Sequence, residues 1–251
     1  MRRLYSDKMI TSRQNGLVKR IRALRDKKFR DEFGEFVVEG AKSVREAFAL
    51  GRRVVAVAAT VKGAALIADL NAETEILSDD VFASVSEEVT PQGVLAIVKK
   101  PDGAATPVSG KCVFLDGVSD PANVGAIIRS AAAFGYNAVL IADGADAYSN
   151  KAVRASTGGI FRVKILSGTR AEMLAEIKAP IVVADMRGAD VNSAAIPAEH
   201  CLVIGNEAHG VSGELRAKAD YTVAIPMQNG MESLNAAVSA GIIMYATSVN
   251  S

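Results

Sequence analysis

Residues 225–235 read Ile-Pro-Met-Gln-Asn-Gly-Met-Glu-Ser-Leu-Asn, and they join a short apolar strand to a long apolar helix. Two other loops have a similar composition and position. They are residues 120–129, Asp-Pro-Ala-Asn-Val-Gly-Ala-Ile-Ile-Arg, and residues 205–210, Gly-Asn-Glu-Ala-His-Gly. Because ligands bind beyond the carboxyl ends of parallel strands, we expect the three loops to form one composite pocket at a sheet edge.

Short apolar runs around these loops indicate an α/β fold. They alternate with predicted helices and cover residues 113–115, 138–141, 181–184, 202–204 and 221–225. Continuous apolar strands bounded by helices are typical of a mostly parallel sheet that is covered on both faces. The periodicity alone therefore predicts an open doubly wound sheet in the C-terminal part of the chain.

A smaller α/β sandwich is predicted upstream of this sheet. We expect a basic helix near residues 12–30, and the other elements are helices at 41–50 and 62–70 and strands at 35–39, 54–59 and 93–99. Pro, Gly and small polar residues then collect at 101–110, as is typical of a linker. The sequence thus predicts a domain over residues 1–100, a linker at 101–110 and a larger domain over 111–251.

The net charge of +1 hides a strong asymmetry along the chain. Residues 1–30 hold eleven Lys and Arg against two Asp, so this segment carries +9 and the remainder carries −8. A basic end on an acidic body indicates a bound polyanion, with nucleic acid as the first candidate. A solvated helix face would give the same pattern, so charge alone leaves both interpretations open.

The cysteines and histidines do not indicate a metal site. Cys112 and Cys201 each begin an apolar strand without a short-range partner, which favours buried free thiols in a reducing compartment. Only His200 and His209 supply imidazoles, and no cluster has the spacing of metal ligands. The N-terminus lacks an apolar signal core, and the uncharged stretch 234–249 is too short to span a bilayer. We therefore expect a cytoplasmic protein without a membrane anchor or a metal.

The first loop has the features of a helix start. Asp120 is a good cap, Pro121 suits the first turn and Gly135 ends the helix. Asn123 lies in the first turn, where unpaired backbone N–H groups favour an anion. Arg129 lies further along among apolar neighbours, and is either a surface residue or a phosphate-binding residue of a site.

The other two loops hold residues that also have simple structural explanations. The stretch from Gly205 to Gly210 lacks the Lys of a P-loop, and no dinucleotide-binding glycine fingerprint follows any strand. Glu207 between these glycines is a turn residue or a catalytic carboxylate. Ser233 and Asn235 at the start of the last helix are most simply N-caps. Three such loops on one sheet edge nevertheless favour a site.

Together these loops resemble the three motifs of the SpoU (TrmH-type) RNA 2′-O-ribose methyltransferases of the SPOUT superfamily. The matching patterns are Asn123-x-Gly-x-x-x-Arg129, Gly205-x-Glu-x-x-Gly210, and Ile225-Pro-Met227 with Ser233-Leu-Asn235. Residues 151–159 also look like the family's link between the first two motifs. Residues 12–40 resemble the substrate-binding domain that many members carry, so the resemblance covers nearly the whole chain.

The resemblance implies a fold that periodicity alone does not reach. The C-terminal sheet would contain a deep trefoil knot, an exception to the rule against knots, and the N-terminal sandwich would resemble a ribosomal protein. The knot loops would bind S-adenosylmethionine, and the protein would work as a homodimer. The residues implied for cofactor binding are Leu202, Ile204, Gly205, Asn206, Glu207, Gly210, Ile225, Met227, Ser233, Leu234 and Asn235.

The activity implied is methyl transfer from S-adenosylmethionine to a ribose 2′-hydroxyl of ribosomal (23S) RNA. Transfer RNA as substrate, an inactive RNA-binding protein of the same fold, and a small-molecule enzyme are the alternatives. Arg129 would bind the nucleotide phosphate and stabilise negative charge, with the proton acceptor left open. The other residues of the reaction centre would be Asn123, Glu207, Ser233 and Asn235. The residues expected to contact RNA are Arg13, Lys19, Lys27, Lys28 and Arg30.

Overall fold

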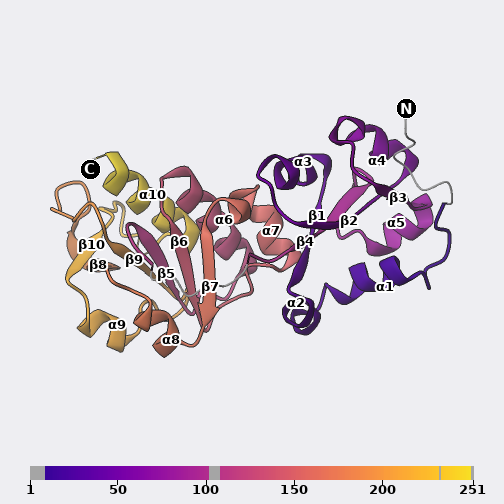
Figure 1. Ribbon diagram of the computed structural model, residues 1–251. Helices are drawn as coiled ribbons and strands as arrows, with labels where there is room; N and C mark the ends of the chain where they lie inside the picture. Colours follow the sequence, from indigo (N-terminus) through magenta and orange to yellow (C-terminus); the bar gives the residue numbers. More distant parts are fainter. Residues whose placement is uncertain (1–8, 102–107, 232, 250–251) are drawn as a thin grey trace. The chain divides into compact units, whose positions relative to one another are not determined.

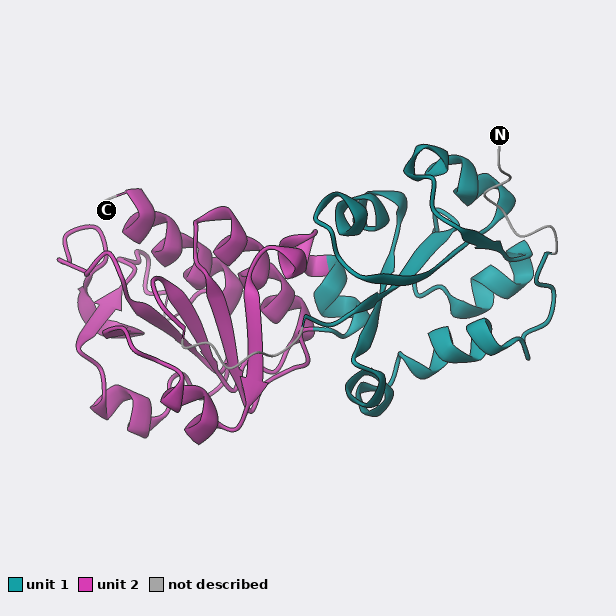
Figure 2. Cartoon of the chain, in the orientation of Figure 1, with its two compact units in different colours: residues 1–102, 148–154 teal, residues 103–147, 155–251 magenta. Residues whose placement is uncertain are grey.

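The computed structural model describes residues 9–101, 108–231 and 233–249, and the chain divides into two units. Unit 1 contains residues 1–102 and 148–154, and unit 2 contains residues 103–147 and 155–251 (Figure 2). Each unit has its own sheet and its own cluster of buried apolar side chains (Figure 1). Residues 102–107 of the predicted linker lie outside the described residues.

Unit 1 contains a four-stranded mixed sheet in the order β1-β4-β2-β3. Strand β4 is antiparallel to both β1 and β2, and β3 pairs in parallel with β2 at the edge. Its strands are β1 (Glu35–Glu39), β2 (Val54–Ala59), β3 (Thr74–Ile76) and β4 (Val94–Lys99). Its helices include α1 (Gly16–Ala23), α2 (Lys27–Phe33), α3 (Ala41–Ala49), α4 (Val61–Ala65) and α5 (Asp79–Val85). The predicted strands at 35–39, 54–59 and 93–99 and the helix at 41–50 are confirmed.

The single basic helix predicted near residues 12–30 is wrong, because the chain forms two helices there. Helix α1 ends at Ala23, and Asp26 then caps α2 by accepting a hydrogen bond from the Lys28 backbone N–H at 2.9 Å. The helix predicted at 62–70 is shorter, with a separate 3₁₀ turn at Ala68–Leu70. Strand β3 and helix α5 were not predicted, since a three-residue strand gives almost no periodic signal.

Unit 2 contains a six-stranded parallel sheet in the order β10-β8-β9-β5-β6-β7. Its strands are β5 (Cys112–Asp116), β6 (Ala138–Ala142), β7 (Lys164–Gly168), β8 (Ile181–Asp190), β9 (Cys201–Gly205) and β10 (Tyr221–Ala224). Helices α6 and α10 pack together on one side of the sheet, and α8 and α9 lie on the other (Figure 1). These helices are α6 (Pro121–Ala133), α8 (Arg170–Ala175), α9 (Gly213–Ala217) and α10 (Ala236–Val249).

The predicted parallel sheet covered on both faces is therefore confirmed. Strand β7 was not predicted, because its half-buried residues Lys-Ile-Leu-Ser-Gly lack a continuous apolar run. Helix α6 begins as expected, with the Asp120 side chain accepting a hydrogen bond from the Ala122 backbone N–H at 3.0 Å. Helix α7 spans Asn150–Ser156, and its residues 150–154 group with unit 1 while residues 155 and 156 group with unit 2.

A buried polar cluster lies at the amino-terminal edge of the unit 2 sheet. The Tyr136 hydroxyl is 2.7 Å from His200 Nε2 and 2.9 Å from Thr247 Oγ1 on α10. His200 Nδ1 lies 2.8 Å from the Pro197 carbonyl oxygen, which can only accept, so Nδ1 carries a proton. Burial lowers the pKa of His200 and raises the pKa of Tyr136, so both side chains are neutral at pH 7.

No helix in the described part of the chain is long and apolar enough to cross a membrane. Both cysteines are buried and unpaired, and Cys112 and Cys201 are directly opposite each other on the neighbouring strands β5 and β9.

Candidate functional site

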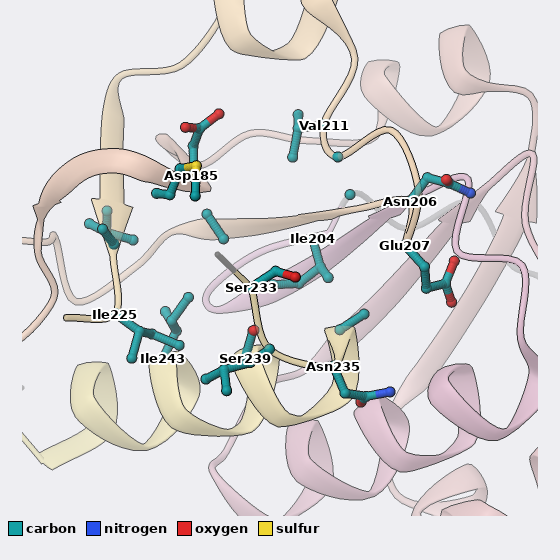
Figure 3. Close-up of a pocket in the computed structure, with 18 of the residues that line it drawn as sticks. Asp185, Ile204, Asn206, Glu207, Val211, Ile225, Ser233, Asn235, Ser239 and Ile243 are labelled. Carbon is teal, nitrogen blue, oxygen red and sulfur yellow. The ribbon is translucent and has the colours of Figure 1, made fainter. Parts of the chain in front are cut away.

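A cavity of about 630 Å³ lies in unit 2, beyond β9 and β10 and beside the start of α10 (Figure 3). This volume is in the range of small-molecule sites in proteins. Four stretches of chain contribute its lining residues, and they fall within 184–186, 204–211, 223–227 and 233–243. The second and third of the three predicted loops thus line one cavity at a sheet edge.

The first loop contributes none of the described lining residues, but Asn123, in the first turn of α6, bonds to two residues that line the cavity. Asn123 Nδ2 donates a hydrogen bond to Glu207 Oε1 at 2.9 Å, and Asn123 Oδ1 accepts one from Asn235 Nδ2 at 2.9 Å. These two bonds hold the Asn123 amide from both sides, and only 8% of the Asn123 surface is exposed. Hydrogen bonds through Glu207, Asn123 and Asn235 therefore connect the three loops.

Asn235 has a structural role as well. Its Oδ1 accepts hydrogen bonds from the backbone N–H groups of Ala237 at 2.9 Å and Val238 at 3.3 Å. The expected N-cap is therefore confirmed for Asn235. Ser233 lines the cavity and is exposed (Figure 3). The cap fixes the Asn235 side chain so that its Nδ2 is directed at Asn123.

Glu207 is held as an ionised carboxylate. Its Oε2 accepts from the Ser119 backbone N–H and hydroxyl, both at 3.2 Å, and its Oε1 is 3.4 Å from the Asp120 backbone N. Partial burial alone would raise the pKa of Glu207, but the hydrogen bonds from Asn123 and the backbone outweigh it and lower this pKa. Glu207 therefore carries its charge at neutral pH.

The loop that carries Glu207 is closed by its own backbone. Asn206 and Gly210 exchange two backbone hydrogen bonds, at 3.0 and 2.9 Å, and Asn206 Nδ2 donates to the Gly117 carbonyl oxygen at 2.7 Å. A Cβ atom on Gly205 would lie 2.2 Å from the backbone carbon of Gly210, which no side chain allows. Gly205 is therefore required for the loop to fold back on itself, and Gly210 has a positive φ of 68°.

The cavity is acidic. Asp185 and Glu207 contribute carboxylates, and no Lys, Arg or His is among the described lining residues. Asp185 accepts hydrogen bonds from Arg187. These bonds lower the pKa of Asp185 and outweigh the effect of its partial burial. Arg216 Nε lies 3.2 Å from the same carboxylate. Asp185 is thus paired with two guanidinium groups, and Glu207 is the carboxylate of the lining that has no cation partner among the described residues. An unpaired carboxylate favours a ligand with positive charge.

Arg129 does not join the group formed by Asn123, Glu207 and Asn235. It lies six positions after Asn123 along α6, or about 9 Å of helix. Its side chain is exposed, does not line the cavity, and is 3.5 Å from Thr157 Oγ1, at the limit of a hydrogen bond. One chain alone thus places this guanidinium outside the cavity.

Most residues predicted to bind a cofactor line this cavity. Leu202 is the exception, since it is fully buried in the centre of β9, two residues before the strand reaches the cavity. Sequence reasoning missed several lining residues, including Met186, Val211, Ser239 and Ile243. It also missed Asp185, although an acid at the end of the apolar run Val-Val-Ala was a usable signal. The predicted residues that do line the cavity are Ile204, Gly205, Asn206, Glu207, Gly210, Ile225, Met227, Ser233, Leu234 and Asn235.

Of the residues predicted to contact RNA, Arg13, Lys19, Lys27 and Lys28 are exposed on unit 1. Lys27 forms an ion pair with Asp31. Arg30 does not fit this prediction, because only 4% of it is exposed. Its guanidinium donates to the Leu24 and Arg25 carbonyl oxygens at 2.7 and 2.6 Å. Arg30 therefore closes the end of α1 and has no surface to offer a phosphate.

Comparisons with known proteins agree with this geometry. Residues 110–245 match the SpoU rRNA Methylase family, and residues 15–96 match the MRM3-like substrate binding domain. The chain is 33% identical to the 23S rRNA (guanosine(2553)-2′-O)-methyltransferase RlmP of Bacillus subtilis, over 95% of this chain and 98% of that protein.

Two solved structures with a bound cofactor also resemble the chain. The AdoMet-bound rRNA methyltransferase of Sinorhizobium meliloti has a TM-score of 0.83 at 28% identity, over 98% of each chain. The SpoU methyltransferase AviRb of Streptomyces viridochromogenes, in complex with AdoMet, has a TM-score of 0.81 at 28% identity. That match covers 94% of this chain and 98% of AviRb.

Proposed function

The chain belongs to the SpoU rRNA methylase family, and on that premise we propose that it methylates a ribose 2′-hydroxyl of 23S ribosomal RNA with S-adenosylmethionine as donor. The observation that carries this proposal is the acidic cavity whose loops are joined by Asn123, Glu207 and Asn235. The reaction is ribose 2′-O-methylation of RNA.

The residues of the cavity fit S-adenosylmethionine. The cofactor supplies an electrophilic methyl group on a positively charged sulfur and has no phosphate. Glu207 provides a negative charge without a cation partner, and the described lining residues include no Lys or Arg that would attract a phosphate instead. Apolar side chains such as Ile204, Ile225 and Ile243 offer contact area for an adenine ring. We assign cofactor binding to the predicted residues that line the cavity.

Bound S-adenosylmethionine would supply the methyl group to the ribose 2′-oxygen. The carbon–sulfur bond would break with its electron pair left on the sulfur, and the hydroxyl proton would pass to water. Negative charge develops on the ribose oxygen before the new bond is complete. The amide of Asn123 is fixed by Glu207 and Asn235 at the cavity edge, so it needs no reorientation during the reaction. We propose that this group positions the ribose and that Arg129 binds the phosphate and stabilises the developing charge.

A second copy of the chain is the natural occupant of an apolar stripe on α10. The stripe consists of Val238, Ile242, Tyr245 and Val249, which are 50, 38, 57 and 62% exposed. Their spacing of three to four residues places them on one helix face. Contiguous apolar side chains exposed in this way mark interaction surfaces. We propose that two copies associate through this stripe as a homodimer.

Dimerisation would also bring Arg129 to a cavity. Helix α6 packs against α10, with the Phe134 and Tyr245 rings 5.8 Å apart and Ser130 beside Gly241. Arg129 is the residue before Ser130 on α6, and its own side chain lies beside Thr157. We propose that each Arg129 serves the cavity of the other subunit, since its own chain leaves it outside.

We propose that unit 1 is the RNA-holding domain and unit 2 the catalytic domain, following the predicted division at 101–110. The trefoil knot expected in unit 2 stays a prediction from the family resemblance. We propose a cytoplasmic location, because ribosomal RNA is the proposed substrate.

The first test is methyl transfer from labelled S-adenosylmethionine to ribosomal RNA from a strain that lacks this gene, with mapping of 2′-O-methylated sites. We expect one new site in 23S RNA. Arg129→Ala should abolish transfer and retain cofactor binding, while Lys178→Ala, an exposed cation of the same unit, should keep full activity. No transfer to ribosomal RNA, with transfer to tRNA instead, would replace the substrate proposed.

The second test separates the two positions proposed for Arg129. Arg129→Ala and Glu207→Ala change exposed side chains, so both variants should fold. Each should be inactive alone. If Arg129 acts across the dimer, co-assembly of the two should restore about a quarter of wild-type activity, since about half of the dimers are mixed and each has one complete site. No recovery in verified mixed dimers would place Arg129 in the site of its own subunit.

A further inference from the structure

Unit 1 contains a hollow of about 690 Å³ that shares no described lining residue with the cavity in unit 2. Residues 9–11 run beside β3, where the Ile10 backbone N–H donates to the Ile76 carbonyl oxygen at 2.7 Å and the Ser78 backbone N–H donates to the Ile10 carbonyl oxygen at 3.0 Å. This segment and the turn before α1 form one wall, and β2 and β3 form the other. The lining residues are Met9, Ile10, Thr11, Ser12, Gln14, Asn15, Leu17, Ala56 and Glu75.

The hollow combines apolar surface with polar groups that have no partner in the described chain. The side chains of Gln14 and Glu75 form no hydrogen bond or ion pair with another described residue. Ser12 and Asn15 instead accept bonds from the backbone N–H groups of Gln14 and Leu17, which fixes the turn. Met9, 45% exposed, adds a flexible apolar surface at the rim. Such a site offers apolar contacts to the face of a flat ring and hydrogen bonds to the polar edge of the same ring.

Some cations near the hollow have partners within the protein and others do not, and unpaired cations are available to bind the phosphates of a nucleic acid. Three arginines of the α1 region have internal partners: Arg20 with Glu35, Arg22 with Ser84 and Arg25 with Glu87. Arg13 and Lys19, by contrast, are exposed and have no partner among the described residues. Arg13 lies within the segment 9–17 that contributes most of the lining, and Lys19 follows this segment by two residues on α1. Unpaired positive charge thus flanks the lining segment along the chain.

Resting on the proposed function, we propose that this hollow binds one unpaired base of the RNA substrate, with Arg13 and Lys19 holding the adjoining phosphates. Sequence-specific RNA recognition targets single strands whose bases can be turned out and bonded at their edges. Glu75 can only accept hydrogen bonds, so it selects a base with an exocyclic amino group, such as cytosine. Uracil presents a carbonyl at that position and is disfavoured.

The test uses the full chain and short single-stranded oligonucleotides of cytidine, adenosine or uridine, with affinity measured by fluorescence anisotropy. The wild type should prefer cytidine over uridine by about tenfold, in line with one good base contact. Glu75→Gln should remove this preference, because an amide can also donate to a carbonyl. Glu73→Gln is the matched control, since Glu73 is exposed, lies two residues away and does not line the hollow.

Arg13→Ala and Lys19→Ala should weaken binding of every oligonucleotide to the same degree and reduce the salt dependence, as expected for phosphate contacts. The absence of measurable binding, the absence of a wild-type base preference, or equal behaviour of Glu75→Gln and Glu73→Gln would each overturn the proposal. Methyl transfer to ribosomal RNA is measured with the same wild-type preparation. Transfer without a base preference overturns only the hollow; a base preference without transfer overturns the proposed methylation.

Discussion

The two edges of the unit 2 sheet hold polar clusters of similar size with opposite properties. At the carboxyl edge, Asn123, Glu207 and Asn235 form a hydrogen-bonded group beside a cavity, and Glu207 stays charged. At the amino edge, Tyr136, His200 and Thr247 form a hydrogen-bonded group that is buried, and burial keeps it neutral. Helix α10 is tied to one cluster at its start and to the other near its end.

This difference teaches that residue type does not separate a reactive cluster from a structural one. Tyr and His are common catalytic residues, whereas Asn is not, yet here the Tyr and His are enclosed. Access to solvent and to a cavity decides which cluster can do chemistry. Changes at the carboxyl edge should therefore affect function first, and changes at the amino edge should affect stability first.

The largest effect is expected from Gly205→Ala, which breaks the carboxyl edge. The new methyl group would overlap the backbone at Gly210 and Val211, so the loop must open. We expect loss of S-adenosylmethionine binding by titration calorimetry and destabilisation of about 1–3 kcal/mol by thermal unfolding. Gly213→Ala is the control, because a Cβ there meets nothing within 4 Å. Normal cofactor binding by Gly205→Ala would show that the closed loop is not required.

A smaller effect should come from Asn123→Ala, compared directly with Tyr136→Phe. The first removes the link between Glu207 and Asn235, and we expect methyl transfer to fall by about 10²-fold, with the pKa of Glu207 raised. The second removes a buried hydroxyl with two partners, and we expect a loss of about 1–3 kcal/mol of stability with unchanged transfer by the folded enzyme. Kinetics and chemical denaturation on both variants give the comparison. The reverse pattern would contradict our assignment of the two edges.

The smallest effect concerns pH and sharpens the contrast at the amino edge. Burial lowers the pKa of His200, so the unfolded chain takes up a proton more readily than the folded one. Stability is therefore complete above a pH of about 6.5 and falls as the pH drops below that value, by at most about 1.4 kcal/mol per pH unit. Denaturation curves between pH 5 and 7 should show this slope. His200→Gln should remove it, and the exposed His209→Gln should leave it in place.

The sequence predicted much of unit 2 because its signals are local. Apolar runs at 113–115, 138–141 and 202–204 and a capped helix after Asp120 all correspond to elements of the structure. The three loops could be placed on one edge because parallel strands share a direction. Asn235 was correctly seen as a cap, but its second bond, to Asn123, joins residues 112 positions apart. No local pattern encodes such a contact.

The errors in unit 1 have a similar origin. A run of basic residues at 12–30 predicted one helix, but α1 and α2 are separate and Arg30 turns inward to the carbonyl oxygens at the end of α1. Charge patterning treats every Arg as a surface residue and cannot detect a guanidinium that satisfies backbone groups. The prediction that Leu202 binds the cofactor failed for the opposite reason. Leu202 lies two residues before the cavity on β9 and is buried in the core.

The closed loop between Gly205 and Gly210 has a consequence for how this chain can evolve. A side chain is excluded at position 205 by contact with the loop's own backbone, and position 210 is strained for any side chain because its φ is positive. Ala208 and His209, between them, are exposed. Mutational drift in this loop should therefore accumulate at positions 208 and 209, which lets a lineage change the chemistry it presents beside the cavity while the length and path of the loop stay constant.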